Sequence, residues 1–174
     1  MTELGLVDRE PRWWTRVVAG AVARPGVSAL LSRVLDPLDR VALRASGGRT
    51  TATEAMTGLP TVVLTARGAH SGLPRAVPLI AVPDRDDVAV IGSHWGRPTH
   101  PAWVANLRAD PRATLDRGRR RVPVVARRLD GVEAAQVWTR ARALYPGYDG
   151  YRRRAGREIA VFRLETAPRE DGRP

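Results

Sequence analysis

The chain has 174 residues, a length that suits one compact domain with a continuous core. It contains no cysteine, which excludes disulfides, zinc–thiolate sites, iron–sulfur clusters and cysteine nucleophiles. The formal net charge is +11, carried by arginine without any lysine, and such a surface favours an anionic partner. Nucleic acid, an anionic membrane and a polyanionic cofactor are the candidates.

Residues 1–58 carry helical signals and predict an N-terminal helical extension. Trp13 and Trp14 fall on one helical face with the valines that follow. Asp36 is a favoured N-cap with proline after it, so another short helix is expected there. Two interpretations stay open. Either these helices cover one side of a core, or residues 11–24 make a peripheral membrane contact, with tryptophans at the headgroups and arginines on anionic lipid.

The N-terminus does not resemble an export signal. Glu3, Asp8 and Glu10 stand where a signal peptide needs positive charge. The apolar run at residues 17–23 is far shorter than the roughly 20 residues that a membrane span needs. We therefore expect a cytoplasmic protein, which the membrane interpretation would place at the inner face of the cell membrane.

The pattern changes to short strands at residue 61. Residues 61–65 and 88–91 are apolar runs typical of buried strands. Residues 75–82 predict a further strand, and Pro78 inside it favours a sheet edge or a bulge. A turn is expected at residues 84–87.

The second half of the chain predicts two helices, a hairpin and a closing strand. A short helix is expected at residues 101–109 and a hairpin at 112–128. Residues 131–144 predict a longer helix, with an apolar stripe that starts at Val132. Residues 158–164 predict the closing strand.

Short strands joined by hairpins, with helices inserted between them, are typical of an α+β protein built on a small antiparallel barrel. Strands and helices do not alternate enough for a parallel sheet. We place the barrel domain at residues 59–165 and a polar, flexible tail at 166–174.

Three common classes of site are not expected. No pair among the three histidines has the i, i+4 spacing of a helical metal site. Ser71 and Ser93 lie near glycines, but neither has the position of the nucleophile in G-x-S-x-G. The arginine clusters at 117–121 and 152–154 come without a nucleic-acid recognition motif, so no nucleic-acid partner is expected.

The turn at residues 68–72 predicts an anion site. Its glycines expose backbone N–H groups, and His70, Arg67 and Arg75 add positive charge beside them. A plain hairpin turn is the alternative interpretation.

All three tyrosines stand close together after the long helix: Tyr145, Tyr148 and Tyr151. One interpretation is a cap that packs on the barrel and turns its hydroxyls to water. The other is a phenol that acts as a proton donor beside a ring cofactor.

Four segments match known motifs in order and spacing. Residues 64–79, LTARGAHSGLPRAVPL, resemble L-T-T-x-G-x-[KR]-[ST]-G-x-P-R-x-x-P-L, and residues 91–96, IGSHWG, resemble a strand end A-S-x-G-G. Residues 100–111, HPAWVANLRADP, resemble H-P-x-W-x-x-N-L-x-x-N-P, and residues 144–151, LYPGYDGY, resemble L-Y-P-x-Y-x-x-Y. Together these motifs resemble the deazaflavin-dependent nitroreductase family, over about residues 36–165.

The resemblance implies a split β-barrel of the FMN-binding kind, coenzyme F-420 as cofactor, and homodimers as an expected assembly. It implies hydride transfer from reduced F-420 to a small organic acceptor such as a quinone, a nitroaromatic or an enone. It makes Tyr148 the key catalytic residue, with Ser93, Tyr145 and Tyr151 beside it. The cofactor-binding residues that it implies are Ala69, His70, Ser71, Arg75, Val77, Pro78, Leu79, Ile80, Ile91, Gly92, Ser93, His94, Ala102, Trp103, Asn106 and Tyr148.

Two positions depart from the family pattern. His70 replaces a lysine or arginine, and histidine is only partly charged near neutral pH, so phosphate affinity is expected to be weaker or supported by Arg67. His94 and Trp95 are bulky at a strand end where small or cationic residues are usual, so we expect a reshaped acceptor pocket. Two alternatives remain: an FMN- or haem-binding split-barrel protein, and a non-catalytic F-420 carrier.

Overall fold

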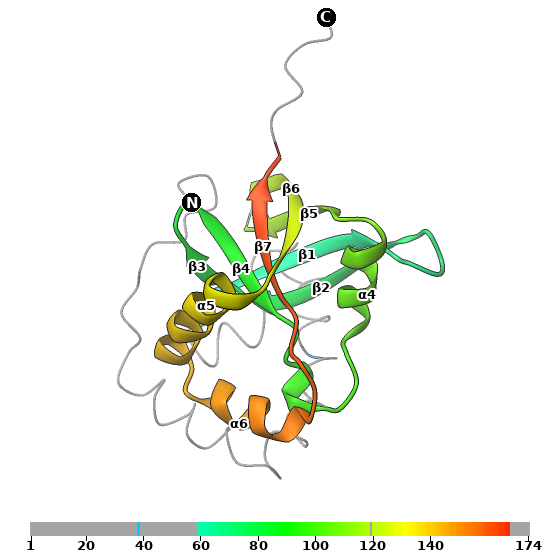
Figure 1. Cartoon of the computed structure of the whole chain (residues 1–174). Coiled ribbons are helices and arrows are strands. Elements are labelled where there is room, and N and C mark those ends of the chain that lie inside the picture. The colour runs from blue at the N-terminus through cyan, green and yellow to red at the C-terminus, as the bar shows by residue number, and fades with distance from the viewer. Residues whose placement is uncertain (1–37, 39–58, 119, 168–174) are drawn as a thin grey trace, which may run out of the picture.

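A computed structural model of the chain describes Leu38, residues 59–118 and residues 120–167. Within them, one antiparallel sheet with the strand order β2-β1-β5-β6-β7-β4-β3 curls into an open half-barrel (Figure 1). The strands are β1 (Thr61–Arg67), β2 (Pro74–Ile80), β3 (Val82–Asp84), β4 (Asp87–Ile91), β5 (Arg112–Arg117), β6 (Arg120–Leu129) and β7 (Val161–Thr166). The helical elements are η1 (His94–Gly96), α4 (Ala102–Ala109), α5 (Gly131–Leu144) and α6 (Gly147–Ala155). This architecture confirms the predicted α+β class.

The buried strands follow the apolar pattern of the sequence. β1 pairs with β2 on one side and with β5 on the other, and its first four residues are buried. Along β6, buried residues such as Val122 and Val124 alternate with exposed ones such as Arg121, as expected for a strand with one face on a core. The predicted hairpin of β5 and β6 is confirmed.

Pro78 lies in β2, an edge strand of the sheet, as its missing N–H group requires. The strand predicted at residues 75–82 is, however, two strands. The strand is interrupted at Ala81, whose N–H donates to the carbonyl oxygen of Pro60 (2.8 Å). After Ala81 it continues as β3 at the opposite edge, beside β4.

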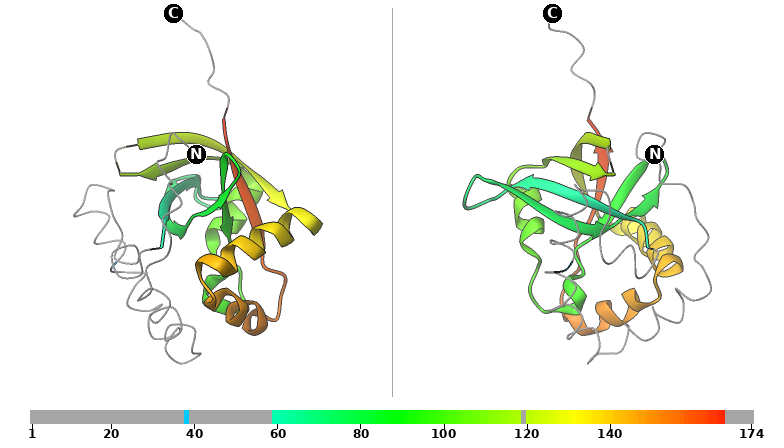
Figure 2. Two further views of the ribbon diagram at one scale, coloured as in Figure 1. Left: turned by 90° about the vertical axis from the view of Figure 1, so that its left-hand side faces the viewer. Right: turned by 180° about the vertical axis from the view of Figure 1, so that it is seen from behind.

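Two apolar clusters form the core, one on each face of strands β4 and β7. The first lies within the curl of the sheet and includes Trp103 and Leu107 of α4. The second lies between β3, β4 and the helices α5 and α6, and it includes Val137 and Tyr148. Figures 1 and 2 show α5 and α6 together on one side of the molecule, and the β1–β2 turn projecting beside α4.

Both C-terminal helices differ in part from expectation. α5 has the predicted bounds, but Val132, placed on its apolar stripe, is 75% exposed, and the buried residues are Val137, Trp138 and Ala141. The segment with the tyrosines, for which the sequence pattern predicts no helix, forms helix α6. Glycine is a poor helix former, so burial of the tyrosines stabilises this helix where local propensity does not.

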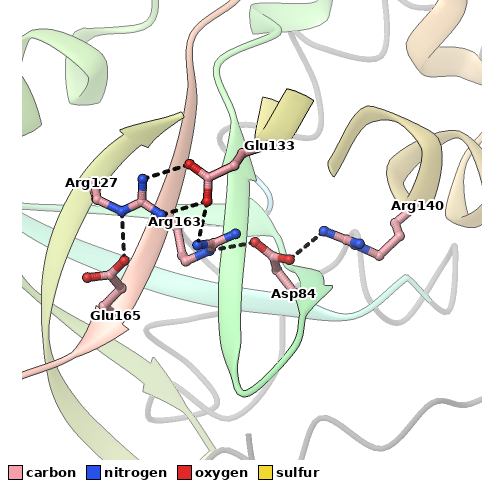
Figure 3. Close-up of polar contacts among 6 residues, drawn as sticks. All are labelled: Asp84, Arg127, Glu133, Arg140, Arg163 and Glu165. Atoms are coloured by element: carbon pink, nitrogen blue, oxygen red, sulfur yellow. Dashed lines mark hydrogen bonds and ion pairs between the residues drawn. The ribbon is translucent and has the colours of Figure 1, made fainter. Parts of the chain in front are cut away.

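An ion-pair network fixes α5 to the sheet (Figure 3). Asp84 is 1% exposed and accepts from Arg163 Nε (2.7 Å) and from Arg140 of α5. Glu133 of α5 accepts from Arg163 (3.0 Å) and, through two hydrogen bonds, from Arg127 (2.9 Å each). Arg127 holds the pKa of Glu133 at about 2, below its usual 4.5. The turn predicted at residues 84–87 is present between β3 and β4, and its first residue, Asp84, is buried.

Some predictions concern residues outside the described part. These are the predictions for the N-terminal extension, of which only Leu38 is described, and for the tail beyond residue 167. The sheet itself runs slightly past the predicted domain end, because β7 continues to Thr166 and the N–H of Ala167 donates to the Pro123 carbonyl oxygen (3.0 Å). No helix among the described residues has the length and apolar character to cross a membrane.

Candidate active site

A cavity of about 640 Å³ opens where the β1–β2 turn, β2, the end of β4, α4 and α6 meet. Its lining residues come from segments far apart in the sequence. They are Thr61, Gly68, Ala69, His70, Ser71, Arg75, Ala76, Val77, Pro78, Leu79, Ile80, Ile91, Ser93, His94, Trp95, Pro101, Ala102, Trp103, Asn106, Tyr148 and Tyr151.

The β1–β2 turn forms the polar end of this cavity. The N–H of Gly68 donates to the Leu73 carbonyl oxygen (2.9 Å), and the N–H of Gly72 donates to that of Gly68 (2.8 Å). A Cβ at Gly68 would lie 2.6 Å from Ser71 Oγ and 3.2 Å from the Leu73 carbonyl oxygen, so the tight turn favours glycine there. Gly72 adopts φ +67°, which also favours glycine.

Asn106 of α4 reaches across to this turn. Its side-chain oxygen accepts from the N–H of Ala69 (2.9 Å), and Asn106 itself is 7% exposed. Within the described residues, the N–H groups of His70 and Ser71 have no hydrogen-bond partner. The turn at which an anion site is predicted therefore has two available amides, because Asn106 already binds the Ala69 amide.

The basic side chains of the turn surround these amides. Arg75 Nη2 donates weakly to Ser71 Oγ (3.4 Å), and both residues line the cavity with His70. Arg67 does not line it, but its guanidinium lies close to Gly72, 3.6 Å from where a Cβ of that glycine would be.

Apolar side chains form the middle of the cavity. Val77 to Ile80 of β2 stand on one side, and Ile91 of β4 and Trp103 of α4 also line it. Gly92, implied as a cofactor contact, is absent from the lining. A Cβ at Gly92 would lie 2.9 Å from a methyl carbon of Val104, so glycine there lets β4 pack closely on α4.

The short element η1 presents His94 and Trp95 to the cavity in a left-handed conformation. His94, Trp95 and Gly96 have φ values of 49°, 58° and 78°. Such backbone costs roughly 1–3 kcal/mol for each non-glycine residue, and strain of this kind is common at functional sites. His94 Nδ1 lies 2.9 Å from the Thr99 carbonyl oxygen.

Two of the three tyrosines, Tyr148 and Tyr151, line the cavity. Tyr145 lies behind them, and its hydroxyl shares a 3.0 Å hydrogen bond with that of Tyr151. The rings pack edge to face, with the Tyr145 and Tyr148 centroids 5.6 Å apart. Gly147 is required because a Cβ there would lie 2.3 Å from the Tyr145 ring. All three tyrosines are at most 4% exposed, so their hydroxyls do not reach bulk water as a surface cap would allow.

Burial raises the pKa of all three phenols. Desolvation is the main cause for Tyr145, Tyr148 and Tyr151 alike, since the charged phenolate loses water on burial. The Tyr148 hydroxyl has no hydrogen-bond partner among the residues that the structure describes, whereas its N–H donates to the Tyr145 carbonyl oxygen (3.2 Å). The site therefore offers a protonated phenol at any pH near neutrality.

Arg157 is a residue that motif and pattern did not single out. Its guanidinium donates to the carbonyl oxygens of Gly92 (3.1 Å) and Thr99 (3.0 Å) behind η1. It also donates to His100 Nδ1 (3.1 Å), and burial together with the charge of Arg157 lowers the pKa of His100 from 6.5. Nothing in local sequence signals such contacts, because they join segments about sixty residues apart.

Of the implied cofactor-binding residues, all but Gly92 line this one cavity, and of the implied catalytic residues only Tyr145 does not. Their roles toward a cofactor remain predictions. In the described ranges, no group of three or more His, Cys, Asp or Glu side chains could hold a metal ion.

Comparison with known proteins defines the family. The family model of the F420H(2)-dependent quinone reductases matches residues 38–166. The chain belongs to this family. The resemblance to a deazaflavin-dependent family is thereby confirmed, with coenzyme F-420 as the cofactor and oxidoreductase as the enzyme class.

Individual relatives agree with the family model. F420H(2)-dependent quinone reductase Rv1261c of Mycobacterium tuberculosis is 29% identical over 108 residues, 60% of this chain and 72% of that protein. Rv3178 of the same species is 32% identical over 106 residues, 61% of this chain and 89% of the relative.

Solved structures support the split-barrel fold. An F420-H2 dependent reductase (FDR-A) is 37% identical, has a TM-score of 0.57, and aligns over 61% of this chain and 94% of its own. A structure described as a domain-swapped dimer is 31% identical, with a TM-score of 0.59, and aligns over 80% of this chain and 96% of its own.

Proposed function

We propose that this family member reduces a quinone with hydride from reduced coenzyme F-420 bound in the cavity. The observation that carries the proposal is the make-up of that cavity. A basic turn with two available amides lies at one end, an apolar wall in the middle, and a protonated phenol at the other end.

The residues present fit the cofactor. The His70 and Ser71 amides and the Arg75 guanidinium would hold its phosphate, because amides and a planar guanidinium bind such oxygens well. The apolar side chains of β2 would pack on the ring, with Trp103 and Ile91 closing the site. When bound, the reduced deazaflavin supplies hydride, and the protein contributes orientation and exclusion of water.

Tyr148 is the residue that we propose to act on the acceptor. Reduction of a quinone to a hydroquinone takes one hydride and one proton, and negative charge develops on the acceptor oxygen. Because burial keeps the Tyr148 phenol protonated, its O–H can donate to that oxygen. Ser93, on the same cavity, is a second hydroxyl within the acceptor region.

The acceptor range is part of the proposal. Nitroaromatics and enones also accept hydride and develop charge on oxygen, so the same donors suit them. The bulky side chains of His94 and Trp95 line this side of the cavity. We therefore propose that flat quinones are better acceptors than branched nitroaromatic compounds.

A turnover assay tests the function. The full chain is mixed with reduced F-420 and menadione, and the absorbance of oxidised F-420 is followed. We expect turnover that depends on both compounds. Binding of F-420 without turnover by any quinone would instead identify a non-catalytic carrier, and turnover with reduced FMN alone would identify an FMN enzyme.

We also propose a cytoplasmic homodimer that contacts the membrane through residues 11–24. The tryptophans beside arginines in that segment support the contact, and the domain-swapped relative supports pairing. Deletion of residues 11–24 should abolish cosedimentation with anionic vesicles at low salt. A full chain that stays in the supernatant would contradict the contact.

A further inference from the structure

The chain turns directly after α6, and this turn places Arg157 next to residues 92–99, several of which line the cavity. Gly156 caps the helix with φ 58°, a left-handed conformation that suits glycine. Arg157 follows at once. Its side chain enters the loop between β4 and α4, residues 92–101, which we call the β4–α4 loop.

Arg157 binds this loop from within. Its Nε donates to the Arg97 carbonyl oxygen (3.2 Å), and its Nη2 donates to those of Gly92 (3.1 Å) and Thr99 (3.0 Å). Its Nη1 donates to His100 Nδ1 (3.1 Å). One guanidinium therefore joins the first, middle and last parts of the loop.

The loop needs such support because its own backbone is strained. η1 contains three consecutive residues with positive φ, two of which are not glycine. Its backbone hydrogen bonds include those from the N–H groups of Ser93, Gly96 and Arg97 to the carbonyl oxygens of residues 91, 93 and 94, and the Gly92 N–H donates to the Ala160 carbonyl oxygen (2.8 Å). On the other side the loop rests on α6, where a Cβ at Gly96 would lie 3.0 Å from the Tyr151 Cα.

The chemistry of these contacts requires arginine. The acceptors are neutral carbonyl oxygens and a ring nitrogen, and within the described residues no carboxylate pairs with Arg157. The planar guanidinium has five N–H donors in a fixed fork, whereas lysine has three donors on one atom. A lysine at this position could not reach Arg97, Thr99 and His100 together.

We propose that Arg157 is a positioning residue that holds the β4–α4 loop and thereby sets the affinity for the acceptor. Ser93, His94 and Trp95 of this loop line the acceptor side of the cavity. Loosening the loop would displace them, while the phosphate end, held by Asn106 and the β1–β2 turn, would keep its geometry. The part of this proposal that concerns the acceptor rests on the proposed function.

Two variants and one control test the proposal in the full chain. Arg157→Lys and Arg157→Ala remove the fork, and Arg153→Ala removes a charge from an exposed position on neighbouring α6. Amide hydrogen exchange of the cofactor-free protein should rise about tenfold or more at Ser93, Gly96 and Arg97 in both Arg157 variants, since several charge-assisted hydrogen bonds are lost. Exchange in Arg153→Ala should match the wild type.

Kinetics provide the second measurement. In both Arg157 variants, the KM for menadione should rise about tenfold, while the Kd of F-420 changes less than threefold. Millimolar guanidinium should restore part of the menadione affinity in Arg157→Ala and have no such effect on Arg153→Ala. If Arg157→Ala does not fold, Arg157→Lys carries the same comparison.

The outcomes separate this proposal from the proposed function. Unchanged exchange at the three amides would overturn the positioning role. Faster exchange with an unchanged menadione KM would overturn the link to the acceptor. A wild-type protein without quinone turnover would refute the proposed function alone, and the exchange measurement would still decide whether Arg157 holds the loop.

Discussion

Tyr148 shows how burial changes the chemistry of one side chain. The residue is 3% exposed, packs edge to face on Trp138 and Tyr145, and has a pKa raised by desolvation. A phenol in this setting stays protonated far above neutral pH. It is therefore suited to donate a hydrogen bond to a developing oxyanion, and unsuited to act as a base.

Replacing Tyr148 with phenylalanine keeps the ring and removes the donor. We expect Tyr148→Phe to lower kcat with menadione roughly ten- to a hundredfold and to leave the Kd of F-420 within a few-fold. Tyr145→Phe, which removes a hydroxyl that does not line the cavity, should act mainly on the acceptor KM. A wild-type kcat for Tyr148→Phe from pH 6 to 9 would assign the proton to Ser93 or water.

The side chains of Arg75 and His70 lie at the opposite end of the cavity from Tyr148. Arg75→Ala should raise the Kd of F-420 about tenfold or more, because a charge-assisted contact to phosphate is lost. His70→Lys should lower that Kd at pH 8, where lysine is fully charged. Fluorescence titration measures both, with Arg153→Ala as a matched loss of surface charge. Unchanged affinity in both variants would place the phosphate elsewhere.

The elements of the fold differ in how far their sequence determines them. α5 has a regular pattern and its bounds were predicted, whereas α6 begins at Gly147 after a proline and forms because Tyr148 and Tyr151 are buried. The break at Ala81 likewise depends on pairing with distant strands. Both the α6 helix and the interruption at Ala81 are therefore set by tertiary contacts, which no local sequence pattern encodes.

Asp84 illustrates the same limit within the ion-pair network of Figure 3. The sequence predicts a turn at residues 84–87 but not the burial of Asp84, whose side chain is 1% exposed and pairs with that of Arg163, which is 8% exposed. The partner comes from β7, nearly eighty residues later, and only the folded sheet brings the two together.

Removal of the Asp84 charge should therefore destabilise the protein. We expect Asp84→Asn to lower the free energy of unfolding by about 3 kcal/mol, because it leaves Arg163 buried without one of its partners. Asp110→Asn, in an exposed pair with Arg112, should lower the free energy of unfolding much less than Asp84→Asn does. Urea unfolding measures both, and equal losses in the two variants would show that the network contributes no more than a surface pair.

At the scale of the whole molecule, the cavity was more predictable than the roles of individual residues. The turn with Gly68 and Gly72, the apolar strand β2 and the start of α4 carry family motifs, and the fold brings them together. Arg157 and the packing role of Gly92 were not predictable, because each depends on contacts across the sheet. The family motifs predict which residues lie around the cavity, and the structure shows which of their polar atoms are available to bind a ligand.

The most direct test of the account is a titration that follows tryptophan fluorescence. Trp95 and Trp103 line the cavity, so a ring bound there should quench their emission. We predict that F-420 binds at least about tenfold more tightly than FMN, a difference of about 1.4 kcal/mol, and that added salt weakens its binding. Equal affinities, or tighter binding of FMN, would contradict the assignment of this cavity to coenzyme F-420.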